Sequence, residues 1–216
     1  MDHTSDYLII GGGMAADAAI GAIREHDPEG RIGLIGDERE PPYERPPLSK
    51  ALWKGDKDIA SIDLDTRRHD VDMHLGRRAV MLDRASLAVR DDQGETHGYK
   101  RLLLATGARV RVLPFEGDRV IHFRTQDDYL RLRRFATEGA HIAVVGGGFI
   151  GSELAASMTG AGCKVTMVFA GDGIGAARFS QGLSDFLNEY YRKRGVDVRT
   201  GIRVSGGKAD DDGVKL

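Results

Sequence analysis

The sequence predicts an α/β protein in which one strand–glycine turn–helix unit occurs twice. An apolar run at residues 7–10 leads directly into three glycines and then into a stretch of small, helix-forming residues. The same order of apolar run, glycines and small residues returns at residues 142–156. A second apolar run follows each copy, at residues 31–36 and 164–169. Strand, turn, helix and strand in this order make a parallel βαβ unit, so we expect two of them.

Length, charge and cysteine content narrow the class of protein. The 216 residues carry 31 basic and 33 acidic side chains, which is too balanced to indicate nucleic acid or an anionic membrane surface as a partner. The acidic start of the chain is a poor signal peptide, and no apolar run approaches the roughly 20 residues of a membrane span. These features predict a soluble, cytoplasmic protein. Cys163 is the only cysteine, which excludes an internal disulfide, a redox-active cysteine pair and a thiolate zinc site within this sequence.

The first glycine turn has the features of a phosphate-binding loop. Gly11 permits the tight turn, Gly13 lets a phosphate approach the backbone, and Ala16 lets helix and strand pack closely. Free amides at the helix start then face an anion. Asp37 and Glu38 end the second strand, where a ribose hydroxyl needs a carboxylate. The motif predicts a dinucleotide-binding, Rossmann-like unit, and the alternative is an ordinary βαβ turn without a ligand.

The second copy is the fuller fingerprint, because Gly146, Gly148 and Gly151 are all present. Asp172 stands where Asp37 stands in the first copy. Two such units imply two bound nucleotides, or one nucleotide and a decayed copy. Pro114 and the polar residues after it mark the crossover, so we predict one domain over residues 1–113 and a second over 114–216.

A proline-rich stretch at residues 40–50 separates the first unit from the rest. Four prolines there are incompatible with a central strand or a helix interior, so the segment is predicted to be a stiff loop before a short helix at 51–53. Such a loop can place the cations Arg45 and Lys50 beside a dinucleotide at little entropic cost. The alternative is a solvated linker.

The remaining segments complete the expected architecture. Strands are predicted at 79–83 and 86–90, with a turn at 91–95, as a small antiparallel excursion. A buried parallel strand is expected from 99 and runs into the small residues of a loop at 105–107. Helices are expected at 126–136 and 179–194, the aromatic residues of the second being interpreted as core. His69 and His74 are interpreted as surface histidines, and no metal site is predicted.

Three motifs together resemble the FAD-dependent pyridine nucleotide oxidoreductases. They are the paired glycine loops, the Pro-Tyr-Glu-Arg-Pro-Pro-Leu-Ser-Lys stretch at 42–50 and the Ala-Thr-Gly at 105–107. The resemblance is to the apoptosis-inducing-factor-like and ferredoxin-reductase-like branch, and residues 48–53 and 147–154 favour the apoptosis-inducing-factor side. It covers essentially the whole chain. Members of the family continue well beyond 216 residues, so the resemblance implies that the fold is incomplete at its C-terminal end.

The resemblance implies a set of cofactor contacts. The residues implied to contact FAD are Gly11, Gly12, Gly13, Met14, Ala15, Ala16, Asp37, Glu38, Arg45, Lys50, Ala79, Ala105, Thr106, Gly107 and Arg124. The residues implied at the nicotinamide dinucleotide are Gly146, Gly147, Gly148, Phe149, Ile150, Gly151, Glu153 and Asp172. Lys50, paired with Glu153, is implied to lie near the flavin, where its charge could stabilise the reduced ring. The alternative is an ion pair without a chemical role.

The implied activity is hydride transfer from NAD(P)H to FAD, with electrons passed to an acceptor such as a ferredoxin, a rubredoxin or a quinone. We expect NADH to be preferred through Asp172, although Arg178 could instead bind the 2′-phosphate of NADPH. The alternative is a truncated nucleotide-binding module without turnover; a flavin monooxygenase-like enzyme is less consistent with the proline loop. Arg131, Arg133 and Arg134 are candidates for docking an acceptor protein, or simply a solvated helix face. The sequence leaves the acceptor and the oligomeric state open.

Overall fold

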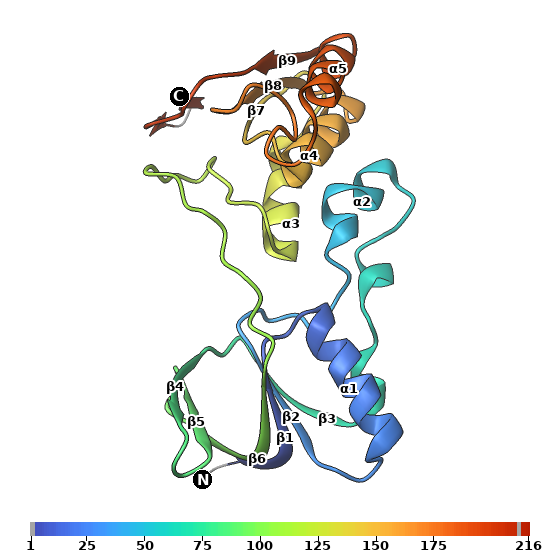
Figure 1. The fold of residues 1–216 in the computed structure, drawn as a ribbon, viewed down its shortest axis with the longest axis vertical. Helices are drawn as coiled ribbons and strands as arrows, with labels where there is room; N and C mark the ends of the chain where they lie inside the picture. The colour runs from blue at the N-terminus through green and yellow to red at the C-terminus, as the bar shows by residue number, and fades with distance from the viewer. Residues whose placement is uncertain (1–2, 211–212) are drawn as a thin grey trace. The chain divides into compact units, whose positions relative to one another are not determined.

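The computed structural model describes residues 3–210 and 213–216, and the chain forms two compact units (Figure 1). The first unit comprises Met1–Arg45 and Ile59–Arg109, and the second comprises Pro46–Asp58 and Val110–Leu216. The division differs from the predicted 1–113 and 114–216. The boundary falls inside the proline-rich stretch: residues 46–58 group with the second unit, because the short helix at 51–54 packs on a helix of that unit.

The first unit is a mixed six-stranded sheet with one long helix. Strands β3, β2, β1 and β6 run parallel, and β5 and β4 add antiparallel strands beyond β6. The elements are β1 (His3–Ile10), α1 (Met14–His26), β2 (Ile32–Gly36), β3 (Val71–Leu75), β4 (Ala79–Asp83), β5 (Ala88–Asp91) and β6 (Thr96–Leu104). Short 3₁₀ turns at Ala60–Ile62 and Thr66–His69 precede β3. The predicted parallel sheet with an antiparallel excursion is confirmed.

Both faces of β1 are buried over residues 8–10, which explains why this end of the strand is continuously apolar. Ile9 faces α1 and packs with Ala16 and Ile20 of that helix. Leu8 and Ile10 face the opposite side and pack against Val89 of β5. The small side chain of Ala16, fully buried, lets α1 lie close to the sheet.

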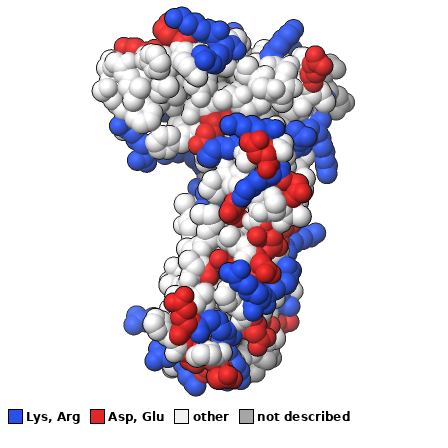
Figure 2. Space-filling model, turned by 90° about the vertical axis from the view of Figure 1, so that its right-hand side faces the viewer, with Lys and Arg blue, Asp and Glu red and all other residues white. Residues whose placement is uncertain are grey.

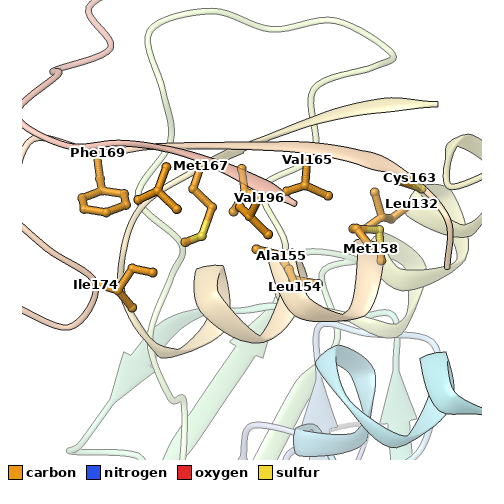
Figure 3. Close-up of a cluster of buried hydrophobic side chains, with 12 residues drawn as sticks. Leu132, Leu154, Ala155, Met158, Cys163, Val165, Met167, Phe169, Ile174 and Val196 are labelled. Atoms are coloured by element: carbon orange, nitrogen blue, oxygen red, sulfur yellow. The ribbon is translucent and has the colours of Figure 1, made fainter. Parts of the chain in front are cut away.

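The second unit is a three-stranded parallel sheet in the order β7-β8-β9, with helices packed on it. Its elements are a 3₁₀ turn (Pro46–Ser49), α2 (Ala51–Lys54), α3 (Gln126–Phe135), β7 (His141–Val145), α4 (Phe149–Gly160), β8 (Lys164–Val168), α5 (Gln181–Arg192), β9 (Val196–Arg199) and the hairpin strands β10 (Lys208–Ala209) and β11 (Val214–Lys215). Figure 3 shows its core, in which Met158 and Ala155 of α4 lie beneath Met167 and Val165 of β8. The second predicted βαβ unit is therefore present.

The proline stretch forms neither a strand nor an α-helix, as predicted; it contains one 3₁₀ turn with Pro46 and Pro47 at its start, and the predicted short helix follows as α2. Two local expectations were wrong. The end of β6 is not buried, since Leu103 and Leu104 are 41% and 61% exposed. In α5 the aromatic Phe186 is 61% exposed, and the polar residues Ser184 and Asn188 are buried instead. Asn188 is buried because its amide group binds the backbone of the preceding loop.

The surface carries both signs of charge. Figure 2 shows lysine and arginine interspersed with aspartate and glutamate on the drawn face, in keeping with the net charge of −2. Within residues 3–210 and 213–216, no helix has both the length and the apolar character needed to cross a bilayer.

Candidate nucleotide-binding sites

The first glycine loop joins the end of β1, at Ile10, to the start of α1, at Met14. Gly11 has a φ of 118°, and a Cβ at this position would overlap the carbonyl oxygen of Ala105. The amide of Ala105 donates to the carbonyl of Ile10 at 2.8 Å, which fixes the 105–107 loop against the turn. Only glycine meets both conditions at position 11.

Gly13 serves a different purpose. It is the N-cap of α1, with a φ of −106°, and a Cβ added to it would have no described atom within 4 Å. No side chain of the described residues caps this helix, so its first amides are left without a side-chain acceptor. An unprotected helix N-terminus beside a glycine with free space in front of it fits a diphosphate group.

The two carboxylates after β2 have different surroundings. Asp37 is 65% exposed and pairs with Arg78 at 2.8 Å, an exposed ion pair that costs little to break. Glu38 is held inward: it accepts a hydrogen bond of 2.5 Å from the hydroxyl of Tyr43 and forms an ion pair with Arg45. Asp37 is thus the carboxylate that can turn to a ribose, and Glu38 positions Arg45.

The second glycine loop repeats this design between β7, which ends at Val145, and α4, which begins at Phe149. Gly146 has a φ of 122°, and a Cβ on Gly151 would overlap the carbonyl oxygen of Gly146. Gly148 is the N-cap of α4, and no side chain of the described residues caps this helix. A Cβ added to Gly148 would have no described atom within 4 Å. Both loops therefore share a positive φ at the strand end and open space at the N-cap, whereas the close approach that excludes a Cβ falls at Gly11 in the first loop and at Gly151 in the second.

An apolar cavity of about 330 Å³ adjoins the second loop. Gly148 and Phe149 form one side of it, and Phe179 and Tyr191 form another. The 173–175 loop closes against the glycine turn, because the amide of Gly175 donates to the carbonyl of Gly147 at 2.7 Å. Sequence reasoning missed Phe179 and Tyr191 as wall residues; the glycines at 171, 173 and 175 were the signal that a loop packs closely here.

The two residues weighed for nicotinamide specificity lie on this same loop. Asp172 is exposed, and its backbone carbonyl accepts a hydrogen bond of 3.2 Å from Asn188. The guanidinium of Arg178 lies 5.8 Å from the ring centre of Phe149. Arg178 therefore lies beside Phe149, the first residue of α4, whereas the role of Asp172 at a ribose stays a prediction.

Lys50 and Glu153 meet, as the family resemblance implied. Lys50 Nζ lies 2.7 Å from Glu153 Oε2, and Ser49 Oγ donates to the same oxygen at 2.6 Å. The segment is anchored to α4 by Ser157, whose hydroxyl donates to the carbonyl of Ser49 at 2.8 Å. The pair is half-exposed, with 48% of the Lys50 side chain accessible, so the lysine can reach a bound molecule.

The other predicted contact residues fall in both units. Ala79 begins β4 in the first unit, and Thr106 and Gly107 follow β6 with exposed backbone. Arg124 belongs to the second unit, where its amide donates to Asp128 at the N-terminal cap of α3. Lys50 also belongs to the second unit, so its predicted contact with the ligand of the first loop stays a prediction.

Two parallel βαβ units, each with an uncapped helix behind a glycine turn, define a protein with paired dinucleotide-binding folds. The family model described as pyridine nucleotide-disulphide oxidoreductase matches residues 5–216. The chain belongs to this family, in its ferredoxin-reductase-like branch.

Relatives and solved structures agree with this placement. The chain is 33% identical over 211 residues to the ferredoxin--NAD(+) reductase component of the p-cumate 2,3-dioxygenase system of Pseudomonas putida, covering 94% of this chain and 52% of that protein. It is 31% identical to the mitochondrial apoptosis-inducing factor 1 of Dictyostelium discoideum, covering 92% and 42%. The crystal structure of the covalent putidaredoxin reductase–putidaredoxin complex superposes with a TM-score of 0.89 at 31% identity, covering 97% of this chain and 52% of that one. The chain thus spans about half the length of the curated relatives it matches.

Proposed function

We propose that this chain binds FAD at the first glycine loop and NADH at the second. We further propose that hydride passes from the nicotinamide to the flavin, and electrons from there to an acceptor of the ferredoxin or rubredoxin type. The observation that carries the proposal is the repetition of one loop design, with a left-handed glycine at the strand end and an uncapped helix behind it. The names of relatives that act on ferredoxin, rubredoxin and NAD(+) support the choice of reaction.

FAD supplies the redox chemistry when bound, since its ring accepts a hydride and releases electrons singly. The protein's own residues bind and orient. The first amides of α1 and α4 receive the two diphosphates, and the open space at Gly13 and Gly148 admits them. The carboxylate of Asp37 accepts hydrogen bonds from ribose hydroxyls once its exposed ion pair with Arg78 is broken. Lys50, held by Glu153, adds a positive charge beside the site where negative charge develops.

Within these 216 residues the chemistry does not involve a redox-active cysteine pair. Cys163 is the single cysteine, and it is buried against α4 and β8. Burial raises the pKa of its thiol, which makes it a poor nucleophile at neutral pH. The cytoplasmic location expected from the sequence stays a prediction.

A second candidate function is a nucleotide-binding module without turnover. It is favoured by one observation: the second glycine loop and the cavity beside it lie within one compact unit. Such a module would bind a dinucleotide at this loop.

An absorption spectrum of the purified protein separates the two functions. A flavin spectrum that bleaches on anaerobic addition of NADH supports the oxidoreductase. Colourless protein that does not take up added FAD, but quenches NADH fluorescence on binding, supports the module. The variant Gly13→Ala is the matched control, because it fills the space required by the first diphosphate without touching the second loop.

A further inference from the structure

Three histidine rings meet inside the first unit, away from the glycine loop. His3 begins β1, His74 lies on β3, and His97 lies on β6. The ring centres of His3 and His74 are 4.3 Å apart, those of His74 and His97 are 4.5 Å apart, and those of His3 and His97 are 5.0 Å apart. His74 and His97 are buried, so the expectation that His74 is a surface residue was wrong.

The path of β1 explains how its first residue reaches β3. The amides of Asp6 and Tyr7 both donate to the carbonyl of Arg31, which is the pattern of a β-bulge. Before the bulge the strand lies over β2, where Ser5 packs on Gly33; a Cβ on Gly33 would be 2.6 Å from Ser5 Oγ. His3 then pairs with His97 of β6 and faces the side chains of β3.

Each histidine is also oriented by a carboxylate. His3 Nε2 lies 3.0 Å from Glu95, His97 Nε2 lies 3.0 Å from Asp91, and His74 Nε2 lies 3.2 Å from Asp72. Asp72 also lies 3.7 Å from Nδ1 of His3, so it stands between two of the rings. Carboxylates that hold imidazoles in one orientation are the usual outer shell of histidine-bound metal ions.

One ring nitrogen in this cluster lacks a partner. His97 is 1% exposed, and its Nδ1 has no hydrogen-bond partner among the residues that the structure describes. Asp91 only accepts hydrogen bonds, so in the neutral ring the proton lies on Nε2 and Nδ1 carries a bare lone pair. A buried lone pair without a donor is costly, and a metal ion would satisfy it.

The local charge also favours a divalent cation. Asp72, Asp91 and Glu95 bring three negative charges, and Arg77, which pairs with Asp91 and Glu95, brings one positive charge. Because Arg77 already occupies the space between Asp91 and Glu95, an ion is expected among the three rings and not between those two carboxylates.

We propose that His3, His74 and His97 bind one divalent transition metal ion, of which Zn²⁺ is the representative, with Asp72 as the nearest further ligand. One ring nitrogen from each histidine already lies within 4.8 Å of those of the other two. Two nitrogens on a tetrahedral zinc ion are about 3.4 Å apart, because each Zn–N bond is about 2.0–2.1 Å, so side-chain movements that shorten each separation by up to about 1.4 Å complete the site. Imidazole is a ligand that zinc, copper and nickel ions accept. The ion joins β1, β3 and β6 and has a structural role.

Zinc binding by untagged, chelator-treated protein tests the proposal. The protein is dialysed against buffered Zn²⁺ and the bound metal is counted by mass spectrometry, with X-ray absorption at the zinc edge as a second readout. We expect about one zinc ion per chain with an imidazole-rich edge spectrum. His3→Ala is expected to weaken binding roughly tenfold or more, since even outer-shell partners of such sites are worth 10–100-fold. The matched control is His26→Ala, which removes an exposed histidine of α1.

The His3 variant is the decisive one because 32% of that side chain is exposed and its loss leaves the core intact. His74→Gln is the second variant and is expected to weaken binding in the same way. Zinc retention by the parent protein that is no greater than that of His3→Ala overturns the proposal. A loss of equal size in His26→Ala overturns it as well, since binding would then not depend on the cluster.

Discussion

Lys50 Nζ and Glu153 Oε2 lie 2.7 Å apart, although 102 residues separate them in the sequence. The lysine follows a 3₁₀ turn, and the glutamate lies in the second turn of α4. Ser49 donates to the same glutamate oxygen, and Trp53 and Tyr129 fix α2 through hydrogen bonds to the carbonyls of Leu48 and Leu52. The position of this cation is therefore set by a network and not by the lysine alone.

If Lys50 stabilises charge on a reduced flavin, Lys50→Met should lower the midpoint potential of the flavin. We expect it to slow flavin reduction by NADH about tenfold, which corresponds to about 1.4 kcal/mol in the activation free energy. Stopped-flow reduction and spectroelectrochemical titration measure the two effects. Lys54→Met, which removes the exposed last residue of α2, is the matched control.

Glu153→Gln tests the positioning of Lys50 separately from its charge. The variant keeps the lysine but replaces its ion pair with a weaker hydrogen bond. We expect a smaller decrease in the reduction rate than in Lys50→Met. A potential and a rate that are unchanged in both variants would show that the pair is only an ion pair without a chemical role.

The four loop glycines form two matched pairs for a test of what each one does. Gly11→Ala is expected to lower the free energy of unfolding by at least about 3 kcal/mol. The positive φ costs about 1–3 kcal/mol, and the overlap of the new Cβ with the Ala105 carbonyl adds to this. Gly13→Ala should cost no more than about 1 kcal/mol, the usual preference for glycine over alanine at an N-cap. It should nevertheless weaken FAD binding by at least about tenfold. Chemical denaturation and FAD titration measure the two quantities separately.

The second loop provides the same comparison for NADH, with Gly151→Ala as the destabilising change and Gly148→Ala as the change that blocks only the ligand. Unaltered FAD affinity in Gly13→Ala, together with unaltered NADH affinity in Gly148→Ala, would mean that neither open space holds a diphosphate.

The features that the sequence predicted are those encoded locally. The glycine turns, the apolar strands beside them and the helix at Gln126–Phe135 follow from periodicity and from residues next to one another in the chain. The pairing of Lys50 with Glu153 came from the family resemblance, because no spacing rule brings together residues so far apart.

The features that were missed depend on the tertiary path. The buried position of His74 depends on a bulge in another strand, and its polar sequence surroundings gave no sign of it. The exposure of Phe186 was missed for a related reason. Helical periodicity identifies two faces of α5 but not which of them is buried. The buried face is the one that carries Asn188, whose side chain accepts a hydrogen bond from the amide of Ile174.

Asp172 is expected to favour NADH over NADPH, because a carboxylate accepts bonds from a free ribose hydroxyl and repels a 2′-phosphate. Asp172→Ser should reduce the NADH preference roughly tenfold, in line with about 1.4 kcal/mol for the lost discrimination. The ratio of kcat/KM for the two nucleotides measures it, with the exposed Asp185→Ser on α5 as the control. A strong preference for NADPH in the parent protein would instead assign the role to Arg178.

The free energy of unfolding of the first unit should depend on pH in two stages, one caused by His74 and one by Asp91. The measurement is made in the presence of a chelator, so that no metal ion is bound. Burial lowers the pKa of His74, so the unfolded chain takes up this proton first and stability begins to fall below about pH 6.5. For Asp91, burial acts to raise the pKa, but hydrogen bonds from His97, Arg77 and two backbone amides hold it well below the usual value. Its contribution is complete above about pH 4 and is lost as the pH falls further towards the folded-state pKa.

Asp91→Asn should therefore make the second stage shallower and leave the first unchanged, since Asp6, Asp83 and Glu95 of the same unit also have lowered pKa values. We also expect a loss of about 3 kcal/mol at pH 7, because the buried His97 loses its charged partner and Arg77 keeps only Glu95. Denaturant titrations from pH 7.5 to 3 measure both effects, and Asp56→Asn, at an exposed position after α2, is the control. If the variant still lost stability below about pH 4 as steeply as the parent, some carboxylate other than Asp91 would have to be the origin of the acid transition.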